Sequence, residues 1–296
     1  MTGVKSREEK IIEMIAHLVM ILLTILALAP FLLLVSGSFT ESKTIVKFGY
    51  QFWPKEFSIE AYRYIAAEWA QIGRTYLITI LVTVVGTAGS LVLVSLMGYG
   101  LIHKDVPGLK IVFILILLTM MFNGGIVSSY MIYTNVFHIK NTIWALIIPN
   151  LLLNGFNILL IKNYLQQNIP GELMEAAEID GAGQLLIYQK IVLPLSTPIL
   201  ATIGLLTAIT YWNDWTNGLY YITDARLYSV QLLLNEINNN VQFLASKADL
   251  AHLTSGLPTA TIRLAIAVAG ILPIVLIYPF FQGYFVKGIT MGAVKG

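Results

Sequence analysis

Residues 172–194 read ELMEAAEIDGAGQLLIYQKIVLP, and they stand between long apolar runs of a very hydrophobic chain. Pro170 suits the first turn of a helix, and Gly181 suits the end of one. The small and apolar residues between them recur at helical spacing, so a short helix presents a small-residue face. A second helical stretch at 184–192 leads to Pro194, where the next apolar run begins. The sequence therefore predicts a polar two-helix segment between two membrane spans.

The composition of the chain excludes a water-soluble core. Of the 296 residues, 57% are hydrophobic and only 11% are charged, whereas soluble domains carry about 25% charged residues. So many apolar side chains require lipid as their solvent. A net charge of +2 without basic clusters gives no reason to expect nucleic acid as a partner. The chain has no cysteine, which excludes disulfides, thiolate zinc sites and cysteine nucleophiles.

Six stretches are long enough to cross about 30 Å of hydrocarbon as helices. They are approximately 15–39, 76–102, 109–133, 142–161, 195–212 and 264–285. The first apolar run exceeds about 15 residues, the usual upper limit in a signal peptide, so we predict an uncleaved span rather than a cleaved signal. The sequence predicts a single all-α integral membrane domain, residues 1–296, with six transmembrane helices.

Glycine positions inside the predicted spans leave two interpretations open. Residues 123–125 interrupt the third span, and a backbone break at membrane depth is tolerated only where protein or a water-filled cavity covers it. Packing of neighbouring helices through small residues is the simpler explanation. For Gly86, Gly89 and Gly98 in the second span, we expect close helix packing rather than transport chemistry.

The spacing of residues in the segment 172–194 resembles the coupling loop, or EAA loop, of permease subunits in binding-protein-dependent ABC importers. The matching positions are Glu175, Ala176, Ala177, Asp180, Gly181, Ala182, Ile191, Leu193 and Pro194. The resemblance implies that these residues couple the chain to a separate ATPase, with small side chains that allow close approach. Without the resemblance, the segment would be interpreted as a solvated amphipathic connector between two spans.

Other stretches extend the resemblance over nearly the whole chain. Residues 284–296 are similar to the tail of maltose-type (MalG-like) sugar permeases, which reaches toward the ATPase dimer. Residues 122–125 with Tyr130, and residues 141–149, resemble the LplC/YtcP group of polysaccharide importers. Residues 211–214 resemble the Trp-Asn-acidic element that ends the fifth span in sugar permeases.

The resemblance implies a type I ABC importer permease fold and a role in moving oligo- or polysaccharides into the cell. The implied partners are a second homologous permease subunit, two cytosolic ABC ATPase subunits and an extracytoplasmic solute-binding protein. The chain itself would hold no cofactor, because ATP and Mg belong to the ATPase. In agreement, it has no Gly-x-x-x-x-Gly-Lys-[Ser/Thr] loop to cradle phosphates.

The same resemblance predicts the orientation in the bacterial cytoplasmic membrane. Because ATP is cytosolic, the coupling loop 162–193 and both chain termini are expected in the cytosol. Residues 40–75, 134–141 and the long loop 213–263 are then expected outside. The resemblance implies that residues 217–263 face the solute-binding protein. The distribution of Lys and Arg favours this orientation only weakly.

A polar pathway for sugar is predicted from residues that offer aromatic faces to sugar rings and amides to sugar hydroxyls. The candidates are Asn123, Tyr130, Tyr133, Asn150, Asn154, Asn157, Tyr211 and Asn213. The alternative for each asparagine is a hydrogen bond to a neighbouring helix.

Two other classes of protein fit the sequence less well. A membrane enzyme would need catalytic or metal-ligating residues, but the four histidines lie far apart and there is no His-Glu-x-x-His or Gly-x-Ser-x-Gly motif. A secondary transporter, or a channel subunit, usually holds ionisable residues inside the membrane. The middles of all six predicted spans lack them.

Overall fold

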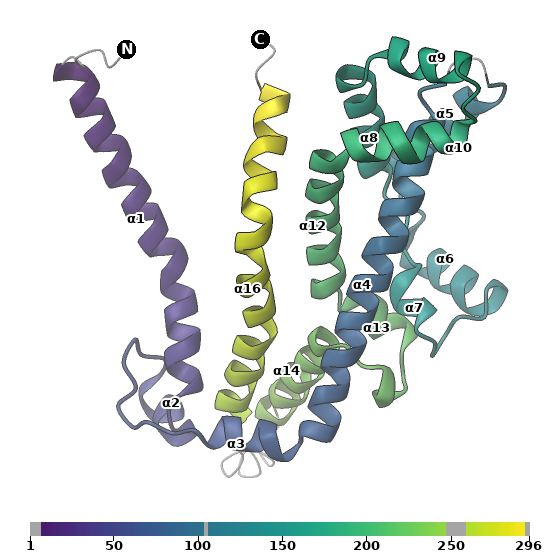
Figure 1. Cartoon of the computed structure of the whole chain (residues 1–296). Helices are drawn as coiled ribbons and strands as arrows, with labels where there is room; N and C mark the ends of the chain where they lie inside the picture. The colour runs from purple at the N-terminus through teal and green to yellow at the C-terminus, as the bar shows by residue number, and fades with distance from the viewer. Residues whose placement is uncertain (1–6, 104–105, 247–258, 294–296) are drawn as a thin grey trace. The chain divides into compact units, whose positions relative to one another are not determined.

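The computed structural model describes residues 7–103, 106–246 and 259–293 of the chain (Figure 1). Within these residues the regular elements are all helical, apart from an isolated bridge between Thr40 and Phe57. The prediction of an all-α protein is confirmed. The chain divides into two compact units, residues 1–69 with 236–272 and residues 70–235 with 273–296.

The first unit is built on a long apolar helix, α1, whose side chains are mostly exposed. Its elements are α1 (Arg7–Ser38), α2 (Ser42–Phe48), α3 (Glu60–Ala67), and parts of α14 (Val230–Ser246) and α16 (Thr259–Ala293). At the end of α1, the ring of Phe39 stacks on Phe57 and on Tyr62, with centroids 5.6 and 4.8 Å apart. These rings hold the loop between α2 and α3 against α1.

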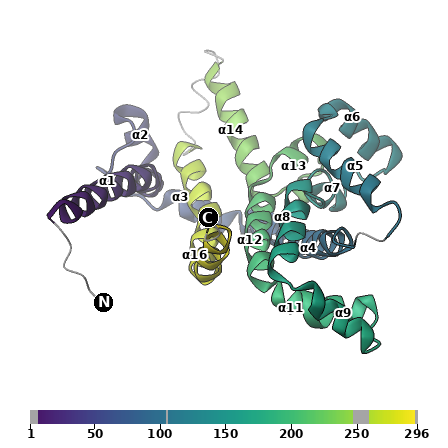
Figure 2. The same cartoon turned by 90° about the horizontal axis from the view of Figure 1, so that it is seen from above.

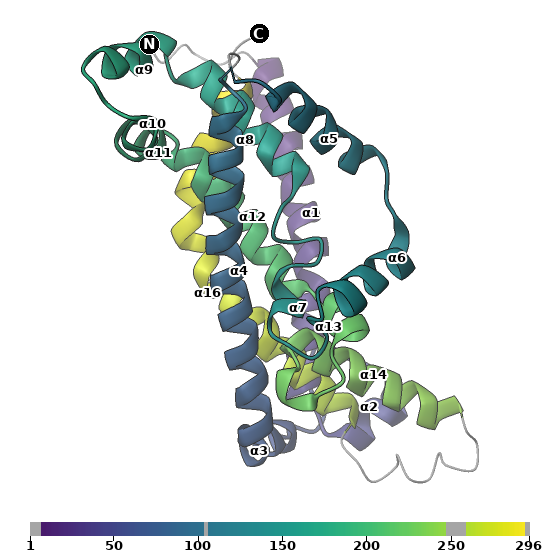
Figure 3. The same ribbon diagram turned by 90° about the vertical axis from the view of Figure 1, so that its right-hand side faces the viewer.

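The second unit holds the polar two-helix segment and most of the predicted pathway residues. Its elements are α4 (Trp69–Gly100), α5 (Leu109–Met121), α6 (Gly125–Met131), η1 (Ile132–Val136), α7 (Trp144–Ile147), α8 (Gly155–Asn168), α9 (Gly171–Ile179), α10 (Gln184–Ile187), η2 (Tyr188–Val192), α11 (Leu193–Leu195), α12 (Thr197–Asn213), α13 (Thr216–Tyr221) and η3 (Ala225–Leu227). The helices α8 and α12 lie beside α4 (Figures 2 and 3).

Two buried clusters of apolar residues hold the second unit together. One cluster joins α4, α5, α8, α10, η2 and α12 around Val94, Ile161 and Ile187. The other joins α4, α7, α12, α13 and the start of α14 around Leu146 and Tyr221. Because α4 contributes residues to both clusters, it connects the two apolar cores of this unit.

Glycines on α4 allow its neighbours to approach closely, as the sequence predicts. A Cβ atom on Gly86 would lie 2.5 Å from Cζ of Tyr211 on α12, and one on Gly98 would lie 2.6 Å from Cγ2 of Ile161 on α8. Real Cβ atoms do not make such contacts. The interpretation of these glycines as packing positions is therefore confirmed.

Among the described residues, three helical stretches are apolar and long enough to cross a membrane: Glu8–Ser38, Trp69–Gly100 and Ala260–Ile277. A fourth results if Gln184–Leu195 and Thr197–Asn213, which are bent by 79° at Ser196, count as one span. The helix α5 is apolar but has only 13 residues.

The predicted third and fourth spans each contain a break in the helix. Between α5 and α6, residues 122–124 are not helical, and Gly125 has a φ of +79°. Between α7 and α8, residues 148–154 are not helical, and Asn150 has a φ of +61°. These breaks place polar backbone inside apolar stretches, so each must be covered by protein or line a cavity.

Candidate functional site

The polar segment between α8 and α12 has a turn that is fixed by its own backbone. At the end of α9, the Ala182 amide donates to the Ala177 carbonyl (2.9 Å) and the Gly181 amide donates to the Glu178 carbonyl (3.0 Å). This pair of bonds is the Schellman motif that ends many helices. Gly181 adopts a φ of +85°, and nothing lies within 4 Å of the position of a Cβ on it. Glycine is needed there for its backbone conformation rather than for intrachain space.

The predicted coupling residues divide between two faces of this segment. Ala177, Ala182, Ile191 and Leu193 are partly buried against the apolar cluster that contains Ile187. The exposed positions are Glu175, Ala176, Asp180, Gly181 and Pro194. The structure thus brings part of the motif onto the chain's own core and leaves the other part free for contact.

The exposed face of the segment also carries large apolar side chains. Ile179 at the end of α9 is 87% exposed, and Leu185 on α10 is 64% exposed. Leu173 and Leu186 are exposed as well. Among the charged residues of a polar segment, such a group is typical of a surface that another protein covers.

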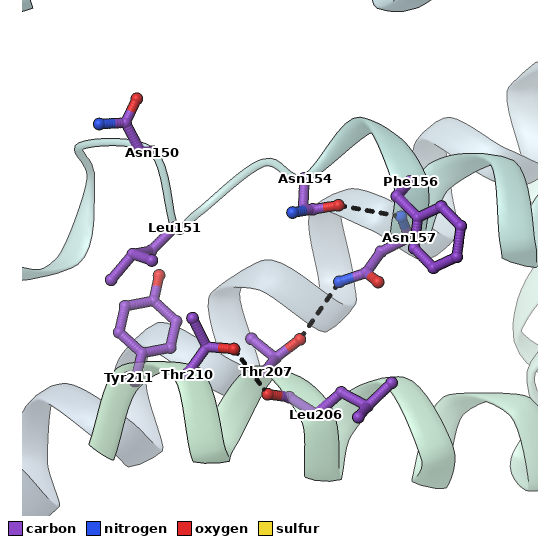
Figure 4. A pocket seen from close by; sticks show the side chains of 9 residues that line it. All are labelled: Asn150, Leu151, Asn154, Phe156, Asn157, Leu206, Thr207, Thr210 and Tyr211. Atoms are coloured by element: carbon purple, nitrogen blue, oxygen red, sulfur yellow. Dashed lines mark hydrogen bonds between the residues drawn. The ribbon is translucent and has the colours of Figure 1, made fainter. Parts of the chain in front are cut away.

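The second predicted site is a cleft of about 240 Å³ in the same unit (Figure 4). Its lining residues come from the break before α8, from the first turn of α8 and from α12. They are Asn150, Leu151, Asn154, Phe156, Asn157, Leu206, Thr207, Thr210 and Tyr211. The lining combines amides, hydroxyls and two aromatic rings and contains no charged side chain.

Hydrogen bonds orient the polar residues of this cleft. The Asn154 side-chain oxygen accepts from the Asn157 amide (3.2 Å) and so caps the start of α8. The side-chain amide of Asn157 donates to the hydroxyl of Thr207 across the cleft (3.4 Å). Asn157 therefore makes the hydrogen bond to a neighbouring helix that the alternative interpretation gives it, whereas Asn154 bonds at the start of the helix that follows it.

Side chains donate hydrogen bonds to backbone carbonyls that have no helical partner at the break between α7 and α8. The Tyr211 hydroxyl donates to the Ile147 carbonyl (2.8 Å), and the side-chain amide of Asn217 donates to the Pro149 carbonyl (3.0 Å). Tyr211 and Asn217 are both buried. A non-helical stretch can persist in an apolar setting only with partners of this kind.

Four of the predicted pathway residues lie together, and four lie elsewhere. Asn150, Asn154, Asn157 and Tyr211 line the cleft. Tyr130 and Tyr133 pack on Tyr221 with ring centroids 5.8 and 5.9 Å away.

The other two predicted pathway residues make local hydrogen bonds. The side chain of Asn123 accepts a bond from the Gly125 amide (2.9 Å), and that of Asn213 donates to the Ile209 carbonyl (2.9 Å). Phe156, Thr207 and Thr210 line the cleft but were not predicted. The position of the break before α8 would have indicated Phe156, whereas Thr207 and Thr210 come from α12, and only tertiary packing brings them to the cleft.

Hydrogen bonds join the loop that contains Asn141 to the loop after α13, near the cluster around Tyr221. The Asn141 side-chain oxygen accepts from the Thr223 amide (2.7 Å) and from the Asp224 amide (3.3 Å). Arg226 forms an ion pair with Asp224 (2.8 Å), and its hydrogen bonds lower the pKa of Asp224 to about 2. The carboxylate therefore stays charged, and paired with Arg226, at a lower pH than an isolated aspartate would.

Comparisons with known proteins identify the family. Residues 106–291 match the model of the family described as "Binding-protein-dependent transport system inner membrane component". The chain belongs to this family of ABC transporter permeases, whose members are transport proteins and not enzymes. The match covers the predicted coupling segment, the cleft and most of the predicted spans.

Individual relatives cover almost the entire chain. It is 36% identical to the polygalacturonan/rhamnogalacturonan transport system permease protein YtcP of Bacillus subtilis (strain 168), over 98% of this chain and 100% of the relative. It is 35% identical to Protein LplC of the same strain, over 92% and 90%. A solved structure of a bacterial ABC transporter involved in the import of the acidic polysaccharide alginate matches with a TM-score of 0.81 and 27% identity, over 96% and 100%.

Proposed function

We propose that this chain is the permease subunit of an ABC importer that moves oligo- or polysaccharides into the cell. The observation that carries the proposal is the segment α9–α10, a turn fixed by backbone bonds that exposes Ile179 and Leu185. A transport subunit without a phosphate loop needs a partner that hydrolyses ATP, and this surface suits such a partner. The residues proposed to couple the two proteins are those of the motif from Glu175 to Pro194.

The proposed assembly contains a second, homologous permease, two cytosolic ATPase subunits and an extracytoplasmic solute-binding protein. Membership of a binding-protein-dependent family supports these partners. The ATPase, and not this chain, would bind ATP and Mg. We propose six spans in one permease domain, with the breaks after α5 and α7 lying inside the third and fourth. The chain ends, 1–6 and 294–296, and the outer-loop residues 247–258 lie outside the described residues.

We propose the cleft between α8 and α12 as part of the sugar pathway. Its amides and hydroxyls can exchange hydrogen bonds with sugar hydroxyls, and the exposed ring of Phe156 can pack on a sugar ring. Unwound backbone that lines a cavity is also where transporters bind their substrates. Polysaccharide substrates are supported by the names of the relatives, which mention polygalacturonan, rhamnogalacturonan and alginate.

The test of this proposal is uptake of labelled glycan fragments by cells with and without the chain, together with copurification of an ATPase. In that assay, Phe156→Leu is expected to raise the glycan concentration for half-maximal uptake roughly two- to tenfold, since an aromatic contact is worth about 0.5–1.5 kcal/mol. Phe156 is 56% exposed, so the exchange should leave the fold intact.

The control for this variant is Phe137→Leu, because Phe137 is similarly exposed (61%) and lies outside the cleft. Equal effects of the two variants, or none, would argue against the cleft as a sugar site. Uptake that does not depend on the chain would argue against the function itself.

The orientation can be tested by cysteine labelling, because the native chain has no cysteine. A cysteine at the exposed position Lys55 is expected to react with an impermeant reagent in intact cells. One at the exposed position Gln167, in the last turn of α8, is expected to react only after lysis. The opposite pattern would show that the coupling segment lies outside the cell.

A further inference from the structure

Two hydrogen-bonded rungs connect the end of α4 to the segment after the α9 turn. The Tyr99 hydroxyl donates to the side-chain oxygen of Gln184 (2.6 Å), and the hydroxyls of Ser95 and Tyr188 lie 2.6 Å apart. Ser95 and Tyr99 are four residues apart on α4, and Gln184 and Tyr188 are four residues apart on α10 and η2. We call these four residues and their two hydrogen-bonded contacts the ladder. Residues at this spacing share one face of a helix, so two matching faces meet here.

The ladder is largely buried and packed. Ser95, Tyr99 and Tyr188 are each less than 10% exposed. The rings of Tyr99 and Tyr188 lie 5.4 Å apart, and His103 meets the Tyr99 ring edge-on at 4.7 Å. Buried hydrogen bonds between packed rings resist sliding, because a displaced hydroxyl would be left without a partner. The end of α4 and the segment 184–188 are therefore held together.

One side chain extends this ladder to α9. The side-chain nitrogen of Gln184 donates to a carboxylate oxygen of Glu178 (2.6 Å), while the side-chain oxygen of Gln184 accepts from Tyr99. The amide orientation is the one that this pair of bonds requires. Gln184 thus links α9, which carries the exposed Ile179, to α4, which carries both apolar clusters of the unit.

We propose that Gln184 and Tyr99 are positioning residues of the coupling machinery, through which a displacement of α9 by the ATPase is transmitted to α4. This inference rests on the proposed function and adds the route by which force enters the membrane spans. Beyond Gln184, the chain forms the π-helical turn η2, which starts at Tyr188. Such turns are frequent at functional sites, and the ladder therefore stands where the α-helical bonding between α10 and α11 is interrupted.

The experiment compares glycan uptake per ATP hydrolysed in the whole assembly. Gln184→Leu removes both side-chain bonds of the bridge and leaves the Tyr99 hydroxyl only its longer bond to the carbonyl of residue 184 (3.4 Å), and Tyr99→Phe removes only a hydroxyl. Each is expected to lower uptake per ATP roughly fivefold, the factor for one lost hydrogen bond. Combining the two should cost no more than Gln184→Leu alone, because both act on the same bridge. The ATPase should still copurify.

The control is Tyr164→Phe, which removes a tyrosine hydroxyl that bonds the Leu195 carbonyl (3.2 Å) instead of a residue of the ladder. It is expected to leave uptake per ATP unchanged. A second test exchanges the partners. Gln184→Glu alone places two carboxylates together and should uncouple transport, whereas Gln184→Glu with Glu178→Gln restores a donor and an acceptor and should rescue it.

Several outcomes would overturn the inference. Normal uptake per ATP in the Gln184→Leu variant would exclude a transmitting role. Loss of the ATPase in parallel with transport would assign the residues to docking instead. A double exchange no better than Gln184→Glu would exclude the bridge. If no ATPase copurifies with the unaltered chain, the proposed function is wrong. That result does not depend on the variants, so it is distinguishable from a failure of this inference.

Discussion

Replacing Ile179 with aspartate is expected to weaken the binding of the ATPase roughly ten- to hundredfold, because burying such a side chain is worth about 1.5–3 kcal/mol. Ile179 is 87% exposed at the end of α9, so the exchange removes almost no intrachain contact. The variant should therefore insert in the membrane at normal levels while transport is lost. Copurification of the ATPase over a range of concentrations measures the effect.

The control for Ile179→Asp is Val106→Asp. Val106 is 50% exposed and precedes α5, outside the predicted coupling motif. The Val106→Asp variant likewise replaces an exposed apolar side chain with a carboxylate, and it should still bind the ATPase. Unaltered ATPase affinity in the Ile179 variant would mean that the exposed apolar face of α9–α10 is not the docking surface.

Gly86→Ala is expected to abolish most transport and to destabilise the chain. The new methyl group would lie 2.5–2.8 Å from three ring carbons of Tyr211. That ring is 3% exposed, and its hydroxyl holds the Ile147 carbonyl at the break before α8. Overpacking of this kind costs about 1–3 kcal/mol. Displacement of the ring would also deform the cleft that Tyr211 lines.

Thermal unfolding in detergent and glycan uptake together check this expectation. Gly100→Ala is the matched control, since it lies on the same helix and nothing is within 4 Å of its Cβ position. It should leave both quantities near those of the unaltered chain. A Gly86→Ala variant with normal stability and uptake would show that α12 can move away from α4 without consequence.

The sequence predicted the membrane class and the polar segment well, because both depend on local signals. Composition alone requires a lipid environment, and Gly181 is placed where the α9 helix ends. The break at 148–154 was not predicted. Its three consecutive leucines raise the hydropathy of the stretch, which hides the turn signals of Pro149 and Asn150.

Only some of the residues that line the cleft were predicted, because local sequence signals specify some of them and not the others. A straight helix over 142–161 would place Asn150, Asn154 and Asn157 on one face at helical spacing, and the cleft does bring them together. It does so through a turn and a helix cap, with Phe156 added from the first turn of α8. The contribution of α12 depends on tertiary packing at Gly86, which no local pattern specifies.

In the turn after α9, backbone bonds fix the shape of the proposed docking surface, whereas exposed side chains determine its affinity. Its two closing bonds join backbone atoms only, so they do not depend on the side chains that point outward. During evolution, Ile179 and Leu185 can each be exchanged for another residue without a change in the course of the chain. The affinity of the proposed docking surface for its partner can therefore diverge by single substitutions, while the geometry that presents the surface is inherited unchanged.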